Sequence, residues 1–511
     1  MANWFSKTEP EDGQAAREDE SIGDLLQRAA DCEQRGEHGG AQECYREVLL
    51  LRPDHPVAGR GLALLLALQG LAHQEAGEFD AAIDCYAESL ALNGGHAEVH
   101  NNLGNVYKSL GRTEDAILAY RDALGINPGL AEAHSNLGGA LYRRGDPGEA
   151  IAHCRAALAL RPSFPEASVT LGYLLEEEGD TPGAMECYRG AIAARPDYAE
   201  AHFNYAMQLL LSGDYANGWQ EYEWRMRMPE VRQLMPFADR AHWDGAALDG
   251  ATILLYAEQG YGDAIHFVRY APLVAARGAR VIVRCAPALA ALVGSMPGVS
   301  AVVSSGEPPA FDLCCPLMSL PRIFGTTLDT IPAQVPYFRP DAGRVLHWKA
   351  RLEAAGPSFK VGLYWATDTK NRISPQRSLT LDSFASLAGL PGITYFSLQR
   401  GAAAAEAARP PGGMTVVDLS PELAGFYDDA ALMSNLDLVI SINTATAHLA
   451  GAMGQRVWTL VQFPPDWRWL LGRDDSPWYP TMRIFRRGQT ESWESVIGRV
   501  SEALGRLVIA R

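Results

Sequence analysis

The chain has 511 residues, of which 47% are hydrophobic and 21% are charged, as in an ordinary globular protein with room for two to four domains. Its formal net charge of −17 argues against nucleic acid or an acidic membrane surface as the main partner, because both require a basic protein surface. The acidic residues 1–21 lack the apolar core of a secretory signal, and no apolar run is long enough to span a membrane. We therefore expect a cytoplasmic protein whose residues 1–21 are disordered.

Small and aromatic residues recur with a period of 34 through the first part of the chain. They are Gly104, Gly138 and Gly172; Ala82, Ala116, Ala150 and Ala184; Tyr86, Tyr120, Tyr188 and Tyr222, with Cys154 in the remaining place; and Pro128, Pro162 and Pro196. This pattern is typical of tetratricopeptide repeats (TPR), in which small residues lie where two helices cross and an aromatic ring fills the gap. We predict a TPR α-solenoid over residues 22–230, with one helix lengthened by about seven residues near 59–70.

Such a solenoid exposes a concave face made by the first helix of each unit. One position on that face is occupied by Asn102, Asn136 and Asn204 in three of the units. Asparagine amides both donate and accept hydrogen bonds, so this row suits the backbone of an extended peptide, and we predict a protein partner in the groove. The alternative is that Asn stands at these exposed helix positions by chance.

From residue 251 the chain changes to short β-rich runs that alternate with helical stretches. The predicted strands are 251–259, 280–285, 300–305, 360–366, 393–399, 415–420, 438–442 and 456–462, and the predicted helices are 263–278, 286–296, 381–390, 428–436 and 444–454. This alternation favours parallel sheets, and the restart after a Pro-bearing link favours two Rossmann-like lobes, 231–343 and 344–511, the second with a C-terminal helix. Ligands of such folds bind at the carboxyl ends of the strands.

The first candidate site is the stretch EQGYGDAIHF, residues 258–267. Gly260 and Gly262 allow the backbone to approach a ligand closely, and Asp263 stands at the start of a predicted helix. A carboxylate at the mouth of a cleft can deprotonate a hydroxyl nucleophile as a general base. The alternative is that Asp263 only caps the helix.

The second candidate site is the loop after the first strand of the second lobe. Its sequence, YWATDTKNRISPQRSL, brings Lys370, Arg372 and Arg377 to one strand end in an otherwise acidic protein. Such cations can neutralise a diphosphate leaving group. A solvated basic loop would have the same composition.

The third candidate site is SINTATAHLAGAMG, where the apolar run 438–442 passes into a predicted helix. Thr444, Ala445 and Thr446 place open backbone N–H groups at the helix start, as an anion site requires. Asn443 can bond sugar hydroxyls or the neighbouring loop. His448, one turn further on, suits packing as well as function.

These segments resemble bacterial glycosyltransferases of the GT-B, heptosyltransferase type, in the subgroup fused to TPR. The matching stretches are GDYANGWQEYEWR, LYAEQGYGDAIHFVRYAPLVAARGA, RSLTLDSF, SLQRG, SINTATAHLAGAMG and FPPDWRWLLGRDDSPWYPTMRIFRR, within residues 212–487. The arrangement is also similar to that of O-GlcNAc transferases and of repeat-bearing flagellin glycosyltransferases. The resemblance implies a GT-B fold and an inverting, metal-independent transfer from a nucleotide sugar, with no other cofactor.

The resemblance also assigns residues to roles. Asp263 takes the place of the general base, and either Lys370 or Arg377 meets the donor phosphates. The remaining residues that it places at the donor site are Gln259, Gly260, Gly262, Gln399, Asn443, Thr444, Ala445, Thr446 and His448. The chain departs from the usual pattern at Asn443, where the family has Asp, and this puts the choice of sugar, or the level of activity, in doubt.

We therefore expect an enzyme that transfers a sugar to a Ser or Thr hydroxyl of a protein held by the repeats, with flagellin as one candidate acceptor. Transfer to a lipopolysaccharide glycan, and a catalytically weak scaffold that only binds a nucleotide, are the alternatives. Such repeats also allow a homodimer. The sequence identifies neither the sugar and nucleotide base of the donor nor the acceptor.

Overall fold

The computed structural model describes residues 11–233, 235–367 and 377–510, with side chains described from residue 19 onward. The chain forms two compact units. One comprises Met1–Leu174 and Ala193–Arg195, and the other comprises Leu175–Ile192 and Pro196–Arg511. The compact units thus divide within the array of helices, well before residue 230, and the last helices of the array belong to the same unit as the strands.

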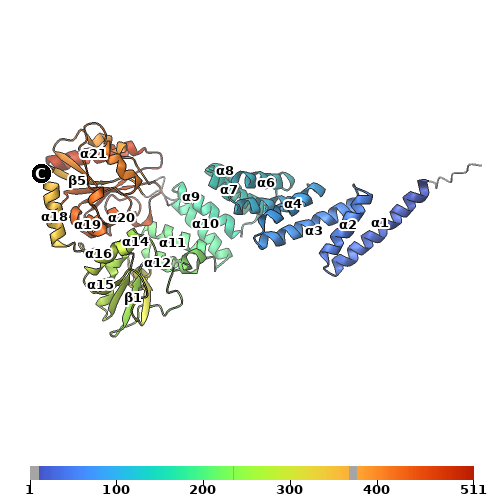
Figure 1. Cartoon of the computed structure of the whole chain (residues 1–511), viewed down its shortest axis with the longest axis horizontal. Helices are drawn as coiled ribbons and strands as arrows, with labels where there is room; N and C mark the ends of the chain where they lie inside the picture. The colour runs from blue at the N-terminus through green and yellow to red at the C-terminus, as the bar shows by residue number, and fades with distance from the viewer. Residues whose placement is uncertain (1–10, 234, 368–376, 511) are drawn as a thin grey trace, which may run out of the picture. The chain divides into compact units, whose positions relative to one another are not determined.

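Consecutive helices fill the chain as far as residue 222 (Figure 1). They are α1 (Glu11–Gln34), α2 (His38–Leu51), α3 (Pro56–Glu75), α4 (Phe79–Leu92), α5 (Ala97–Ser109), α6 (Thr113–Ile126), α7 (Ala131–Arg144), α8 (Pro147–Leu160), α9 (Pro165–Glu177), α10 (Thr181–Ala194), α11 (Ala199–Ser212) and α12 (Tyr215–Tyr222). The predicted lengthening is found in α3, which has 20 residues where α5 has 13.

The helices of a pair approach closely because the recurring glycine has no side chain. A Cβ atom placed on Gly104 would lie 2.5 Å from Cε1 of Tyr120, and one on Gly138 would lie 2.6 Å from Sγ of Cys154. Both of those side chains are fully buried. The residue that fills the gap therefore requires glycine on the facing helix, as the 34-residue pattern predicts.

The start of the chain differs from the expectation of disorder over residues 1–21. Helix α1 begins at Glu11, so that it extends back into this segment. The sequence EDGQAAREDE is rich in Glu, Gln, Ala and Arg, which have high helix propensity, and this composition explains the extension. Residues 1–10 lie outside the described residues.

The first α/β region holds a four-stranded sheet of order β3-β2-β1-β4 whose strands are all parallel. Its strands are β1 (Thr252–Tyr256), β2 (Arg280–Arg284), β3 (Val299–Val303) and β4 (Leu313–Pro316). The predicted helix 263–278 is divided into α14 (Tyr261–Phe267) and α15 (Ala271–Ala275), because Pro272 has no N–H to continue the hydrogen-bond ladder. Helices α16 (Ala290–Gly294) and α17 (Leu320–Ile323) complete the region.

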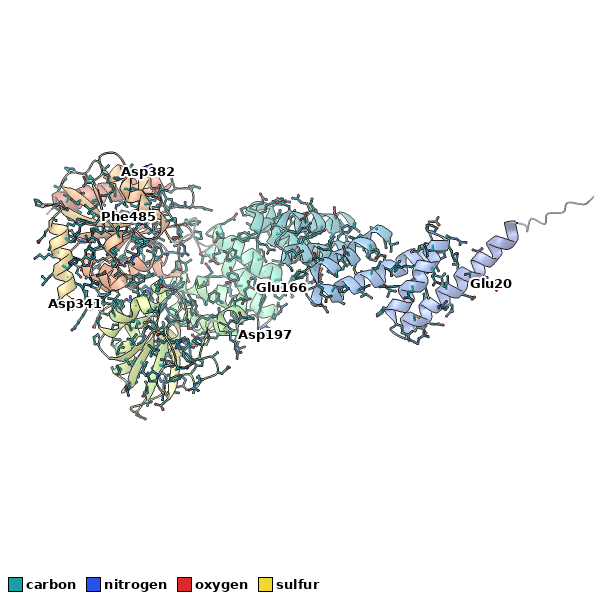
Figure 2. All side chains as sticks on the ribbon, in the orientation of Figure 1. Glu20, Glu166, Asp197, Asp341, Asp382 and Phe485 are labelled. Atoms are coloured by element: carbon teal, nitrogen blue, oxygen red, sulfur yellow. The ribbon has the colours of Figure 1, made fainter. Side chains whose placement is uncertain are left out.

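The second α/β region holds a six-stranded sheet of order β10-β9-β8-β5-β6-β7, again all parallel. Its strands are β5 (Phe359–Tyr364), β6 (Ile393–Ser397), β7 (Val416–Asp418), β8 (Leu438–Ile442), β9 (Val457–Val461) and β10 (Met482–Arg486). Its α-helices are α18 (Ala342–Glu353), α19 (Phe426–Met433), α20 (Ala445–Ala452) and α21 (Trp493–Ile509), while the predicted helix 381–390 is a 3₁₀ segment, Leu381–Leu387. Asp341, labelled in Figure 2, caps α18 by accepting a hydrogen bond from the N–H of Arg344 at 2.9 Å.

The last helix pair is joined to the α/β regions by an aromatic core. Trp219 of α12 is buried, and its ring lies 5.3 Å from Trp467 and 6.2 Å from Phe267. Tyr215, also on α12, accepts a hydrogen bond on its hydroxyl from Nε1 of Trp478 at 3.0 Å. Burial of large aromatic rings contributes strongly to stability, so α12 is held firmly against the strands' connecting segments.

Candidate functional site

One cavity of about 430 Å³ collects residues from all three predicted sites. It is lined by Phe203, Met207, Tyr222, Gln259, Gly260, Gly262, Asp263, Arg377, Asn443, Thr444, Ala445, His448, Asp466, Trp467 and Arg468. The predicted residues among them come from the ends of β1 and β8 and from the loop after β5, which are strand ends in two different sheets. The carboxyl ends of parallel strands thus supply most of the wall.

The loop after β1 places Asp263 in the first turn of α14, with Gly260 as the N-cap residue. Gly262 lies against the other sheet's helix α20, since a Cβ atom here would be 3.2 Å from Cδ2 of His448 and 3.7 Å from the backbone of Ala445. A side chain at position 262 would therefore crowd the start of α20. The glycine lets the turn after β1 approach the predicted anion-binding turn after β8.

Asp263 is held by an arginine that the sequence did not single out. Oδ1 of Asp263 accepts a hydrogen bond from Nη2 of Arg468 at 2.5 Å, and Arg468 is in turn bound by both carboxylate oxygens of Asp466 at 3.0 and 3.1 Å. Burial raises the pKa of the Asp263 carboxyl above its ordinary value, and this effect outweighs the lowering by Arg468. A carboxylate with a raised pKa that also faces a cavity has the properties of a general base.

Arg468 itself is 7% exposed, and its guanidinium lies 4.3 Å from the ring centroid of Trp467. The segment FPPDWRW thus supplies three cavity-lining residues, Asp466, Trp467 and Arg468. In the sequence this segment served only as a family motif. The run Asp-Trp-Arg-Trp places two charged residues among large apolar ones. Charged residues in such surroundings are usually paired, and this is the signal from which a cation–carboxylate pair could have been inferred.

At the end of β8 the backbone N–H groups of the turn are left open, as the sequence predicts. Thr444 is the N-cap residue of α20 and makes no side-chain cap, because its hydroxyl is directed to the carbonyl of Ile442 at 3.4 Å. The backbone N–H groups of Ala445 and Thr446 have no acceptor within the helix, since the first four N–H groups of any helix lack one. Asn443 is 9% exposed, and its side chain lines the same cavity.

His448 lies behind this turn and is 5% exposed. Its Nδ1 is 3.0 Å from the hydroxyl of Tyr479, which is also 3.0 Å from Nδ1 of His266. Burial lowers the pKa of His448 to about 3, and burial also lowers the pKa of His266 well below its ordinary value. Both imidazoles are therefore neutral near pH 7, and His448 contributes shape and hydrogen bonding to the cavity rather than positive charge.

The remaining predicted donor-site residues are placed differently. Arg377 lines the cavity, whereas Lys370 and Arg372 lie outside the described residues. Gln399 is not among the lining residues: its Oε1 accepts from the N–H groups of Trp365 and Ala366, and its Nε2 donates to the carbonyls of Ala366 and Arg400. The Gln399 amide therefore braces the loop after β5. Thr446 is buried and is likewise not among the lining residues.

The repeat array reaches the cavity through α11. Phe203 and Met207 of this helix line the cavity, and Asn204 lies between them in the sequence. The other two predicted peptide-binding residues belong to the other compact unit. There Nδ2 of Asn136 donates to Oδ1 of Asn101 at 3.0 Å, and Asn102 is partly exposed. The amide of Asn136 is thus in contact with the preceding repeat.

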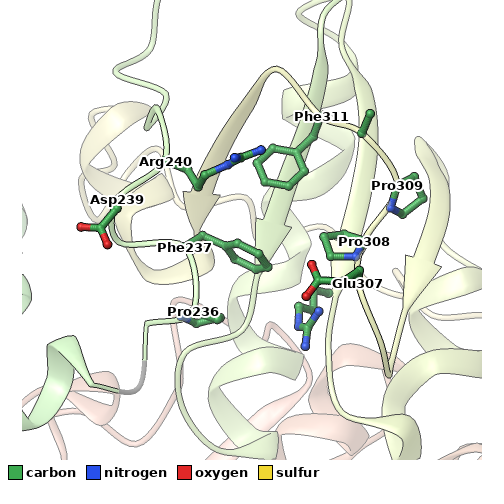
Figure 3. Close-up of a pocket in the computed structure, with 10 residues that line it drawn as sticks. Pro236, Phe237, Asp239, Arg240, Glu307, Pro308, Pro309 and Phe311 are labelled. Carbon is green, nitrogen blue, oxygen red and sulfur yellow. The ribbon is translucent and has the colours of Figure 1, made fainter.

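A second cavity, of about 460 Å³, lies at the end of β2 and is lined by Phe237, Arg240, Arg284 and Phe311 among others (Figure 3). The two guanidinium groups lie over the aromatic rings, Arg240 at 5.0 Å from Phe311 and Arg284 at 5.5 Å from Phe237. None of the predicted site residues lines this cavity. The described residues hold no group of three or more His, Cys, Asp or Glu side chains placed to bind a metal ion. In that same part of the chain, no helix combines the length and apolarity needed to cross a bilayer.

Comparison with known proteins identifies the repeats. Two profiles of the tetratricopeptide repeat match residues 67–131 and 141–202. Protein FlbA of Caulobacter vibrioides is 30% identical over 326 residues, which are 59% of this chain and 54% of FlbA, so the chain spans about half the length of this curated relative.

Among solved structures, the chain is similar to MamA and to PilF of Pseudomonas aeruginosa. MamA is 23% identical with a TM-score of 0.29, and the match covers 32% of this chain and 97% of MamA. PilF is 21% identical with a TM-score of 0.32, and the match covers 42% of this chain and 94% of PilF. The two profile matches place tetratricopeptide repeats, which support protein binding, in the N-terminal half of the chain, and an α/β region with parallel sheets follows them.

Proposed function

We propose that the chain is an inverting glycosyltransferase of the GT-B type, which moves a sugar from a nucleotide-sugar donor to a Ser or Thr hydroxyl of a protein. Residues 231–343 and 344–511 would be its two lobes. The observation that carries the proposal is the cavity of about 430 Å³, where a candidate base, a candidate phosphate-binding turn and α11, the first helix of the last repeat pair, meet. A scaffold without catalysis has no need of a partly buried carboxylate with a raised pKa facing such a cavity.

In the proposed reaction Asp263 is the general base. Arg468 occupies Oδ1 of the carboxylate, so Oδ2 is the oxygen that accepts the proton of the acceptor hydroxyl. The hydroxyl oxygen then attacks the anomeric carbon from the face opposite the nucleotide. The bond between that carbon and the phosphate oxygen breaks, and its electron pair leaves with the diphosphate.

The departing diphosphate needs positive groups close to it. Arg377 lines the same cavity, and the open N–H groups of Ala445 and Thr446 mark the positive end of α20. Lys370 belongs to the same predicted loop and is proposed as a further phosphate contact. Donors fixed before the reaction begins stabilise the developing charge without reorganisation.

The acceptor side of the cavity favours a protein over a glycan. Phe203 and Met207 lie on the first helix of the last repeat pair, which is the helix that forms the concave face in such arrays. A peptide that follows this face of α11 would end beside Asp263. Apolar side chains suit peptide side chains better than they suit a polyhydroxylated sugar.

Two measurements on the full chain test the proposal. Thermal melts with UDP-, GDP-, ADP- and CMP-sugars should show one donor class that stabilises the protein, by about 2.7 kcal/mol at one hundred times its Kd. Radiolabel from that donor should then follow protein, and Asp263→Asn should reduce the rate by about 10²- to 10⁴-fold without loss of donor binding. A flat response to every donor would overturn the proposal, and label in glycolipid would redirect it to a lipopolysaccharide acceptor.

A further inference from the structure

Helix α3 carries a stripe of leucines that nothing covers in the described chain. Leu64, Leu68 and Leu71 are 51%, 46% and 37% exposed. At 100° per residue these three side chains project within an arc of roughly 60° on one face of the helix. The opposite face is packed in the core of the unit through Leu62, Leu65 and Leu66. The helix is therefore apolar on both sides, whereas a helix at the surface of a soluble domain has one polar side.

The helix one repeat further on has no such second apolar face. The residues one repeat further on, in helix α5, are Glu98, Asn102 and Asn105. The same position in the fold is therefore polar in the next repeat, and the leucines are not a requirement of the repeat architecture. Adjacent exposed leucines of this kind mark an interaction surface.

Charged residues at the two ends of the stripe indicate what covers it. Arg60 precedes the leucines and Glu75 follows them, both on the same face of α3 by the helical spacing. Both residues are exposed, and neither forms an ion pair within the described part of the chain. A positive end and a negative end on one apolar stripe make the surface complementary to itself in the antiparallel sense.

We propose that α3 is a dimerisation helix, which packs antiparallel against α3 of a second copy of this chain. In the matching register Leu64 faces the partner's Leu71, and Arg60 faces the partner's Glu75. The two-fold axis passes between residues 67 and 68, so that each contact occurs twice. A parallel arrangement is less favourable because it would place Arg60 opposite Arg60 and Glu75 opposite Glu75.

Sedimentation velocity on the full chain, from about 1 µM to about 100 µM protein, tests this inference because dimerisation depends on protomer concentration. We expect a monomer–dimer equilibrium in the wild-type protein. Leu68→Glu should weaken it at least about tenfold, since each dimer carries the substitution twice in its apolar seam. The matched control is Leu118→Glu, a leucine 59% exposed on helix α6 of the same unit, which should leave the equilibrium unchanged.

Charge-reversal variants distinguish a second copy of this chain from any other partner that could cover the leucine stripe. Arg60→Glu and Glu75→Arg should each weaken the dimer several-fold by placing like charges opposite one another, and the double variant should recover the wild-type equilibrium. Arg60, Leu68, Glu75 and Leu118 are all exposed, so circular dichroism should show that each variant is folded like the wild type. A monomer at every concentration, a dimer insensitive to Leu68→Glu, or a double variant that fails to recover would each overturn the inference and leave the stripe to a different protein.

Discussion

Asp263 and Arg468 form an ion pair at the wall of the cavity of about 430 Å³, with Nη2 of the arginine 2.5 Å from Oδ1 of the carboxylate, although they are 205 residues apart in the chain. Asp466 holds the same guanidinium from the other side, at 3.0 and 3.1 Å. Arg468 therefore links the loop after β1 to the segment after β9. It also lowers the pKa of Asp263, against the larger raising effect of burial.

The first prediction concerns the pH dependence of the proposed transfer. Burial already raises the pKa of Asp263, and Arg468 is the largest influence that lowers it. Arg468→Gln removes this influence, so the pKa of Asp263 should rise further. Because a general base must be deprotonated, the acid limb of the pH–rate profile should move to higher pH.

Rates normalised to each variant's own plateau make this test independent of the folded fraction. The control is Arg473→Gln, since Arg473 forms an ion pair with Asp475 at 2.7 Å on the same segment but outside the cavity. Its profile should match that of the wild type. An acid limb that stays in place in Arg468→Gln would show that Asp263 is not the titrating base.

The second prediction compares two glycines of one loop. A Cβ atom on Gly262 would lie 3.2 Å from Cδ2 of His448, whose ring cannot yield because it is stacked on Trp469 and bonded to Tyr479. A Cβ atom on Gly260 would meet only Oδ2 of Asp263, at 3.8 Å, which is an ordinary contact. Gly262→Ala should therefore displace the start of α20.

The measurement is donor affinity by calorimetry, with the melting temperature recorded in parallel. We expect Gly262→Ala to weaken donor binding about tenfold, or about 1.4 kcal/mol, and Gly260→Ala to weaken it much less. Equal effects of the two substitutions would contradict the close approach between the loop after β1 and the start of α20.

The turns after β1 and β8 could be predicted because their signal is local. In each, an apolar run ends in small residues within a few positions, and period and composition are enough to locate a strand end. The roles of Asp466 and Arg468 could not be predicted in this way. Their function depends on Asp263, which only the three-dimensional fold brings to them.

Two strands of the sheets also escaped prediction, for different reasons. β4 has only four residues and ends in Pro316, which reduces its strand signal to a short apolar run within a loop-rich stretch. β10 lies inside the long motif FPPDWRWLLGRDDSPWYPTMRIFRR, where an exposed arginine and many aromatic residues obscure its alternation. The role of Lys370 stays a prediction, because the residue lies outside the described part of the chain.

The third prediction concerns the buried arginine of the EYEWR segment. Arg225 is fully buried and bonds Glu258 at 2.8 Å, Glu223 at 2.8 Å and Oγ of Ser319 at 2.8 Å. Glu258 directly precedes the loop that carries Asp263. Arg225→Met leaves the Glu258 carboxylate buried without its counterion, and should lower the free energy of unfolding by about 3–5 kcal/mol.

Urea denaturation followed by tryptophan fluorescence measures this loss. The double variant Arg225→Met/Glu258→Gln removes both charges and should recover part of the stability, because the uncompensated charge is then absent. Arg227→Met is the control, since Arg227 is exposed on the same segment and lies over the ring of Trp224 at 4.1 Å. A double variant no more stable than Arg225→Met would mean that packing, not charge, explains the loss.

The last prediction uses Glu176 at the end of α9. Burial raises the pKa of Glu176 to about 7, although its Oε2 accepts a hydrogen bond from the hydroxyl of Tyr188 at 3.1 Å. A carboxyl whose pKa is raised by folding stabilises the folded protein below its unfolded pKa, and this contribution is lost as the pH rises through about 7. Glu176→Gln stays neutral and can still accept from Tyr188. The variant should therefore match the wild type near pH 4 and exceed it by about 3 kcal/mol near pH 8.

Melting temperatures from pH 4 to pH 9 provide the measurement. The control is Glu178→Gln, two residues further on and exposed, which should follow the wild-type curve. The wild-type curve should fall between about pH 4.5 and pH 7 and then level off, and the Glu176→Gln curve should be flatter over the same interval. Parallel curves for the two proteins would mean that Glu176 is ionised in the folded chain well below pH 7, and that the hydrogen bonds of Tyr188 and Gln208 outweigh its burial.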